Sequence, residues 1–385
     1  MGLGFRCRAV GGGAKCLLVV AALTAALDPT AVMAQEGPQA PVPQVADGGV
    51  PTLHVYTNLV QVPSLVLTMN QDLIDKPIAE SRFSVSIDSG RWFRATHVRR
   101  EGDDPISLSI LLDVSGDAAD LMPKMEDALG KLALLSLHPR DRVSVYALHC
   151  SLRRSLHDAP ADSVSLKRAV GAALEPWMMR KRAKQGEGCE LRGHLWDGLG
   201  AVAVALSDSP GRRVILVVTD GRDAGSKNSW NEVRYFAQAK GIAVFALNYA
   251  PASSGIESIG RGRGGYLSSG GGSSAVEKPL VSVCELSGGI VMRMSDPTAL
   301  SKSLERFVTM LRERYIVEFP RAANSTAGNH DLEVKIDKGA YIIVRPSGVS
   351  VALPDPAWTA DPTTIQTGPS QAPEEGKRKV VNKPQ

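Results

Sequence analysis

Three oxygen-bearing side chains alternate in the stretch LLDVSGD, residues 111–117. They are Asp113, Ser115 and Asp117. At an extended strand end or in a tight loop, alternate residues can direct their side chains toward one point. Carboxylate and hydroxyl oxygens are ligands of hard cations. This spacing therefore predicts a site for one divalent cation, either Mg²⁺ or Ca²⁺.

The elements around this stretch have an α/β pattern. Over residues 103–312, runs of valine, isoleucine and leucine alternate with segments of helical spacing, which is typical of a parallel sheet covered by helices on both faces. One predicted strand ends at Asp113, and the strand VILVV is followed by Asp220. Ligands of such sheets bind outside the carboxyl ends of the strands. If these two strands are neighbours, the two carboxylates lie side by side.

Segments on either side of this region alternate apolar and polar residues, as strands with one buried face do. The pattern covers residues 53–102 and returns over residues 313–353. Each segment alone is too small to be a stable domain. We therefore predict that the two pair into one small β-sandwich and that the α/β domain is inserted between them.

Three further segments lie outside the two predicted domains. Residues 1–34 contain basic residues, an apolar run and a small-residue cleavage pattern, and we interpret them as a signal peptide. The run is well short of the roughly 20 residues that cross a bilayer, so no stable membrane span is expected after cleavage. Residues 35–52 are predicted to be a Pro/Gly linker, and residues 354–385 a disordered tail. The protein is thus expected to be secreted or periplasmic.

Charge and cysteine content bound the class of partner. The formal charge is +4, and removal of the signal peptide, with three basic residues and one acid, lowers it to +2. A nearly balanced charge gives no electrostatic reason to expect nucleic acid as a partner. Cys150, Cys189 and Cys284 remain after cleavage, and an odd number of cysteines cannot all pair internally. A Cys150–Cys189 disulfide and three unpaired thiols both stay open.

The two strand ends give the chain a family resemblance. LLDVSGD, followed about a hundred residues later by VILVVTDGRDAGS, resembles a von Willebrand factor type A domain. With its flanking β segments, the chain resembles exported bacterial proteins, abundant in acidobacteria, that carry such a domain between β segments. The resemblance implies a doubly wound, mostly parallel, Rossmann-like sheet. It also implies a metal-ion-dependent adhesion site, whose metal keeps one coordination position for a carboxylate of a protein partner.

Some, but not all, of the ligands that the resemblance implies are present. Asp113, Ser115 and Asp220 match. Asp117 stands where a second serine is expected, and Gly193 stands where a threonine is expected, so the site is degenerate. A charged Asp117 is a hard ligand, whereas Gly193 offers no hydroxyl. The metal-free alternative is that Asp117 caps the following helix while Asp220 accepts loop amides.

A basic segment with one aromatic residue, residues 175–193, precedes this glycine. We predict that an acidic protein partner is contacted by side chains from this segment and from the metal loops: Trp177, Arg180, Arg182, His194 and Arg222. Basic side chains beside an aromatic one are suited to such a partner. The alternative interpretation of the segment is a solvated loop.

Catalytic motifs are scarce in this sequence. It contains no GxSxG, HExxH, CxxC or GxxxxGK[ST] pattern, and its one GxGxxG, at residues 260–265, neither follows a strand nor opens a helix. His149 and Cys150 are adjacent on a predicted strand and would point to opposite faces. We therefore predict a non-enzymatic binding or adhesion module. The alternatives are a metal-free structural scaffold of the cell envelope and an unrecognised hydrolase.

Overall fold

The computed structural model describes residues 59–115, 121–135, 137–182, 193–249, 277–294, 296–320, 328–339, 341–347, 350–351 and 376. The predicted signal peptide and linker lie outside the described residues, as do the GxGxxG stretch and nearly all of the predicted tail. Asp117 also lies outside them.

The strands are β1 (Leu59–Thr68), β2 (Phe83–Ile87), β3 (Phe93–Arg94), β4 (His97–Arg100), β5 (Ile106–Asp113), β6 (Arg142–Leu148), β7 (Leu152–Pro160), β8 (Arg212–Thr219), β9 (Ala243–Tyr249), β10 (Val291–Met294), β11 (Tyr315–Pro320), β12 (Gly328–Asn329), β13 (Leu332–Ile336), β14 (Ile342–Pro346) and β15 (Ser350–Val351). The helices are α1 (Met122–Leu135), α2 (Ser163–Arg182), α3 (Leu195–Leu206), α4 (Trp230–Ala239), α5 (Glu277–Leu286) and α6 (Leu300–Arg312), with short 3-10 turns at Glu80–Arg82 and Pro297–Ala299.

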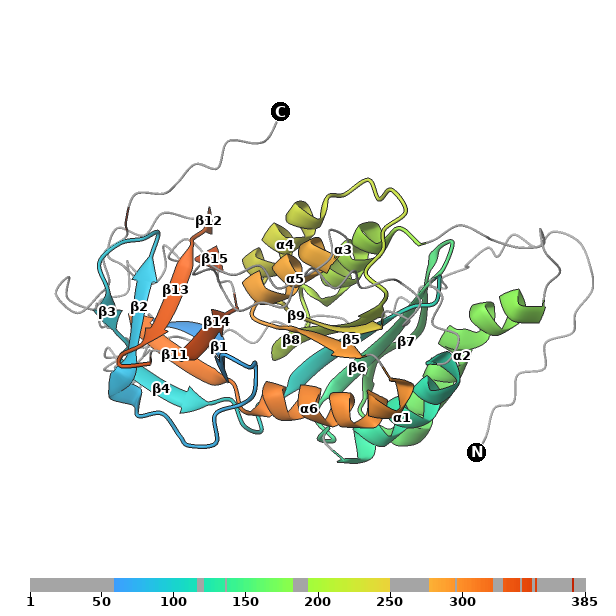
Figure 1. Ribbon diagram of the computed structural model, residues 1–385, viewed down its shortest axis with the longest axis horizontal. Coiled ribbons are helices and arrows are strands. Elements are labelled where there is room, and N and C mark those ends of the chain that lie inside the picture. Colours follow the sequence, from blue (N-terminus) through green and yellow to red (C-terminus); the bar gives the residue numbers. More distant parts are fainter. Residues whose placement is uncertain are drawn as a thin grey trace, which may run out of the picture. The chain divides into compact units, whose positions relative to one another are not determined.

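A six-stranded sheet with the order β10-β9-β8-β5-β6-β7 forms the α/β domain. Its first five strands are parallel, and β7 runs antiparallel at one edge. Starting at the central β5, the chain winds first to one side and then to the other, which is the doubly wound order. Helices α1, α2 and α6 cover one face of the sheet, and α3, α4 and α5 cover the other (Figure 1). The predicted α/β fold class is confirmed.

Strand β5 shows why the sequence pattern identifies this sheet. All eight of its residues are buried, so apolar side chains occur on both faces of the strand, although Ser107 and Ser109 interrupt the apolar run. Leu108 and Leu112 pack in the core under α1, α2 and α6, whereas Leu111 packs in the core under α3, α4 and α5. By the same two-residue period, Asp113 belongs to the α3 side of the sheet.

Strand β7 is not among the strands that the sequence pattern predicts. It follows a hairpin after β6, and none of its residues is fully buried. Exposed residues such as Arg153 and Arg154 remove the apolar alternation by which a strand is recognised. Charged side chains are common on exposed sheet edges, because they oppose pairing with other chains.

The β-sandwich is made from both ends of the described chain. One sheet has the order β14-β1-β11-β4, and the other has the order β13-β2-β3. Strand β1 pairs antiparallel with β11 and β14, and β2 pairs antiparallel with β13. The two sheets enclose one apolar core that includes Val62, Phe83 and Phe319. Each sheet therefore combines strands from before and after the α/β domain.

A buried ion pair joins the two crossovers between these domains. Glu101 follows β4 and Arg314 precedes β11, and they are only 2% and 1% exposed. The two Glu101 carboxylate oxygens accept from Nε and Nη2 of Arg314, each at 2.7 Å. Arg212, at the start of β8, adds an ion pair from Nε to Glu101 Oε1 at 2.8 Å. Charge-assisted bidentate bonds of this kind are among the stronger polar contacts in proteins.

Within the described part of the chain, no helix has both the length and the apolar character that a membrane crossing needs.

Loss of Arg314 should destabilise the protein far more than loss of an exposed arginine. In Arg314→Ala the buried negative charge of Glu101 loses its bidentate partner and keeps only the ion pair with Arg212. We therefore expect the free energy of unfolding to fall by about 3 kcal/mol. The matched control is Arg94→Ala, which removes an exposed pair with Asp337 and should cost under about 1 kcal/mol. Urea denaturation measures both. Equal losses in the two variants would show that the crossover pair is not a major constraint.

Candidate functional site

The Asp113 carboxylate is buried at the carboxyl end of β5, with 3% of the residue exposed. Its Oδ1 accepts from the Ser115 amide at 3.1 Å and from the Ser115 hydroxyl at 2.5 Å. Its Oδ2 accepts from the Thr219 hydroxyl at 2.7 Å. Because β5 and β8 are neighbours, the end of β8 brings Thr219 and Asp220 to the same edge of the sheet.

A tight turn after β8 positions Asp220. The Gly221 amide donates to the Thr219 hydroxyl at 3.0 Å, and the Arg222 amide donates to Asp220 Oδ1 at 3.0 Å. Gly221 has a φ of 79°, and a Cβ built there would lie 3.1 Å from the side-chain nitrogen of Asn248. The turn therefore requires a residue that tolerates positive φ and leaves room for β9.

Charge repulsion at this edge shows in the pKa of Asp113. Burial raises the pKa of the Asp113 carboxyl above its usual range, and the negative charge of Asp220 raises it further. Hydrogen bonds from Ser115 and Thr219 oppose this shift without cancelling it. A cation between two carboxylates removes such repulsion.

The donor set fits a hard divalent cation. Asp113, Ser115 and Asp220 offer only oxygen atoms, and two of the three carry negative charge. No group of three His, Cys, Asp or Glu side chains placed to hold a metal occurs among the described residues. Asp117, the third predicted carboxylate, is not among those residues. The ion would thus be held by Asp113, Ser115 and Asp220, with Asp117 as the remaining predicted ligand.

Gly193 lies next to Ser115, at the place where the resemblance implies a threonine. A Cβ built on Gly193 would lie 3.0 Å from Ser115 Oγ and 2.8 Å from Cγ of the buried Leu148. The packing therefore leaves little room for any side chain at this position. A glycine fits these surroundings, whereas the threonine that the resemblance implies would not.

A second loop, which sequence reasoning missed, ties the turn after β8 to the start of α3. The hydroxyl of Ser226 accepts from the amides of Trp196 and Asp197 at 3.1 and 3.2 Å, and it donates to Asp223 Oδ1 at 2.6 Å. Although burial raises the pKa of Asp223, hydrogen bonds from Ser226 and neighbouring amides bring it below its usual range. The aspartate in DGRDAGS was the available signal, since short side chains of this type often bond nearby amides.

The residues predicted to contact a partner do not form one exposed group in the structure. The prediction for Trp177 is wrong, because the side chain is 6% exposed and packs in the core shared by α1, α2 and α6. Arg180 and Arg182 belong to α2, which continues past Pro176, so this part of the basic segment is not a loop; their side chains lie outside the described part. His194 and Arg222 are exposed beside the site.

Neither described cysteine supplies a nucleophile. Cys150 is disulfide-bonded, and its partner lies outside the described residues; the prediction of three unpaired thiols is therefore wrong. His149 Nδ1 lies 3.3 Å from Cys150 Sγ, contrary to the expected opposite orientation, because β6 ends at Leu148 and the pair is in the hairpin. Cys284 is free and fully buried, and burial raises the pKa of its thiol far above the usual range.

The sequence matches no family model and no curated protein. Similar solved structures include the conserved hypothetical protein BatB from Bacteroides thetaiotaomicron (19% identity, TM-score 0.37), with 54% of this chain and 98% of that chain covered. Von Willebrand factor type A from Catenulispora acidiphila has 11% identity and a TM-score of 0.38, with coverage of 75% and 74%. Proximal thread matrix protein 1 from the mussel byssus, with a zinc-occupied MIDAS motif, has 14% identity and a TM-score of 0.38. The match covers 55% of this chain and 49% of that chain.

In the presence of chelator, Asp113 should make stability fall as pH rises. Its pKa is raised in the folded chain, so its contribution to the free energy of unfolding is complete below the ordinary aspartate value of about 4 and is lost as pH rises through the raised value. Asp113→Asn cannot ionise and should lack this decline. Urea midpoints at acidic and neutral pH test this. Parallel pH dependences in the two proteins would contradict the raised pKa.

Restoring the implied threonine should not restore a ligand. Gly193→Thr forces Leu148 or Ser115 to move, so we expect a loss of about 1–3 kcal/mol in the free energy of unfolding. Thermal or urea denaturation measures the loss, with Gly200→Ala as control, because a Cβ at Gly200 would approach Val233 no closer than an ordinary 3.5 Å. A Gly193→Thr protein as stable as the wild type would show that this edge of the site has spare room.

Proposed function

We propose that the protein is an exported, non-enzymatic binding module of the von Willebrand factor type A kind, which uses the carboxyl edge of its sheet and one divalent cation, Mg²⁺ or Ca²⁺. The observation that carries this proposal is the buried carboxylate of Asp113. Burial and the charge of Asp220 both disfavour its ionised form, while Ser115 and Thr219 hold it in one orientation. An oriented carboxylate beside a second one is an arrangement that a cation stabilises.

In this proposal the residues of the chain act mainly by orientation. Ser115 and Thr219 fix the two oxygens of Asp113, and the Arg222 amide fixes one oxygen of Asp220. When bound, the cation would offer an open coordination position to a carboxylate of a protein partner. The exposed His194 and Arg222 lie beside the site, and the positive charge of Arg222 favours an acidic partner.

A metal-free scaffold of the cell envelope is the second candidate. The missing hydroxyl at Gly193 favours it, as does the fact that both Asp113 oxygens already accept protein hydrogen bonds. The two candidates differ in their response to metal, since only the first gains stability from a cation.

Added Mg²⁺ or Ca²⁺ should raise the melting temperature of the mature protein. At a hundredfold excess over the dissociation constant, binding stabilises the native state by about 2.7 kcal/mol, on the order of 3–5 °C for a chain of this size. Asp113→Ala and Asp220→Ala should abolish the rise, because each removes a charged ligand. Glu333→Ala, at an exposed position on β13, should retain it. A wild-type melting temperature that neither metal nor chelator changes would contradict metal binding and favour the metal-free scaffold.

Capture of a partner should depend on the same cation. If a carboxylate completes the coordination of the metal, chelator should release an envelope protein that the immobilised wild-type chain retains, and Asp220→Ala should not retain it. Comparison of proteins eluted with and without chelator measures this. Retention that is equal in both conditions would mean that any binding surface works without metal.

A further inference from the structure

A pocket of about 730 Å³ lies at the amino end of the sheet, between the α/β domain and the sandwich. Pro105 before β5, Arg212 and Arg213 at the start of β8 and Gly241 before β9 line one side. Gln61 and Pro63 of β1 and Ser347 after β14 line the other. Seven residue steps of β8 separate Arg213 from Asp220, roughly 23 Å at about 3.3 Å per residue. The pocket is thus distinct from the Asp113 site.

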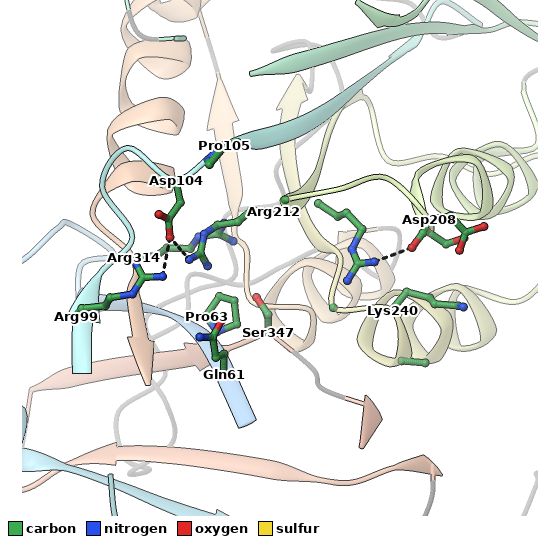
Figure 2. A pocket seen from close by; sticks show the side chains of 15 residues that line it. Gln61, Pro63, Arg99, Asp104, Pro105, Asp208, Arg212, Lys240, Arg314 and Ser347 are labelled. Atoms are coloured by element: carbon green, nitrogen blue, oxygen red, sulfur yellow. Dashed lines mark hydrogen bonds and ion pairs between the residues drawn. The ribbon is translucent and has the colours of Figure 1, made fainter. Parts of the chain in front are cut away.

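Positive charge exceeds negative charge around this pocket. Its cationic lining residues are Arg99, Arg212, Arg213, Lys240 and Arg314, and its acidic ones are Asp104 and Asp208. Figure 2 shows Asp104 with Arg99 and Arg212 on one side of the pocket, and Lys240 with Asp208 on the other. Glu101 lies behind Arg212 and Arg314, and Glu318 Oε1 lies 4.0 Å from Arg99 Nε, so with both included one positive charge remains unbalanced.

Three of the five cations are already neutralised. Arg314 and Arg212 pair with Glu101, Arg99 and Arg212 pair with Asp104, and Arg99 also pairs with Glu318. Although burial raises the pKa of Asp104, the hydrogen bonds and charges of Arg212 and Arg99 bring it below its usual range. These groups form a fixed wall, and the unbalanced charge belongs to the other side of the pocket.

Arg213 lines the pocket but takes no part in these ion pairs. Its Nη1 donates to the Ser207 carbonyl at 2.6 Å, and no carboxylate among the described residues forms an ion pair with it. Its buried Nε has no hydrogen-bond partner in the described structure. The guanidinium thus has its charge and one buried donor uncompensated, which is costly for a charged group.

Ser347 brings a second unsatisfied group to the same pocket from the sandwich. The residue is 1% exposed, and its hydroxyl has no hydrogen-bond partner among the described residues. In Figure 2 it lies between the Asp104 side and the Lys240 side of the pocket. Buried polar atoms without partners are rare in native proteins, so two of them lining one pocket indicate a missing partner.

From these observations we infer that the pocket binds a dianionic oxyanion, the phosphate group of a small polar phosphate monoester. A guanidinium and a hydroxyl are common donors to phosphate oxygens, and the negative charge of such a monoester is attracted by the excess positive charge. The volume lies within the range of small-molecule sites and exceeds what phosphate alone fills. Lys240, exposed at the rim, adds attraction at longer range.

A purely structural role explains only part of this arrangement. Arg213 and Lys240 lie beside the carboxyl ends of α3 and α4, where positive charge is favourable. This accounts for the bond from Arg213 to Ser207. It leaves the Arg213 Nε and the Ser347 hydroxyl unexplained, since neither contacts a helix carbonyl.

Calorimetric titration with inorganic phosphate, at constant ionic strength set by chloride, tests the inference on the mature chain. We expect saturable binding at one site, weakened at least tenfold by Arg213→Gln. Ser347→Ala should weaken binding several-fold while the ligand-free protein stays as stable as before or becomes more stable, because the change removes an unsatisfied buried hydroxyl. Lys302→Ala, at an exposed position on α6, is the charge-matched control and should bind like the wild type.

The outcomes separate this site from the proposed metal site. Chelator should leave phosphate affinity unchanged, whichever way the metal experiments turn out. Absence of saturable phosphate binding by the wild type would overturn the inference, as would equal affinities of the wild type, folded Arg213→Gln and Ser347→Ala. If Lys302→Ala weakens binding as much as Arg213→Gln, the phosphate responds only to net charge, and the inference also fails.

Discussion

The bidentate pair of Glu101 and Arg314 ties together two points of the chain that are 213 residues apart. Both residues lie in crossovers, so the pair keeps the entry and the exit of the α/β domain adjacent. The strands that precede and follow the α/β domain therefore lie close enough to pair with each other. Arg212 extends the same contact to the start of β8, the strand that leads to Asp220 at its other end. The buried Glu101 carboxylate thus contacts both the link to the sandwich and the first residue of β8, whose other end leads to the candidate site.

Sequence reasoning succeeded wherever burial dictated residue type. Strands buried on both faces are mainly apolar, as VILVV in β8 is, and the rule for strand ends correctly predicted that Asp113 and Asp220 share one edge of the sheet. It failed where local pattern and tertiary environment differ. β7 was missed because an exposed edge strand has no apolar face, and Trp177 was misassigned because it is buried in the core on the α1, α2 and α6 face of the sheet. Hydrogen-bond partners such as Thr219 and Ser226 depend on loop geometry that composition does not encode.

The two ends of the sheet differ in their electrostatic character. At the carboxyl edge, aspartates are held close together by hydroxyls and loop amides, so negative charge is concentrated where the strands stop. At the amino edge, arginines outnumber the carboxylates that line the pocket. Between the ends, β5 and β8 are mainly apolar and buried, and the charged side chains of both strands stand at their ends. Each end can therefore interact with its own type of ligand without altering the charge balance at the other.

The pairing of β1 with β11 also constrains the order in which the chain can fold. Leu59 pairs with Pro320, about 260 residues later in the chain. The two strands that pair with β1 in its sheet, β11 and β14, both follow the α/β domain, and β4 pairs only with β11. Closing so long a loop is entropically unfavourable, whereas the pairing of β5 with β8 in the α/β domain joins residues about 106 apart, as in Ile106 and Arg212. The inserted domain is thus expected to fold first, and its formation shortens the effective loop to the distance between Glu101 and Arg314. Until β11 and β14 are available to pair with it, β1 is expected to remain an exposed strand edge.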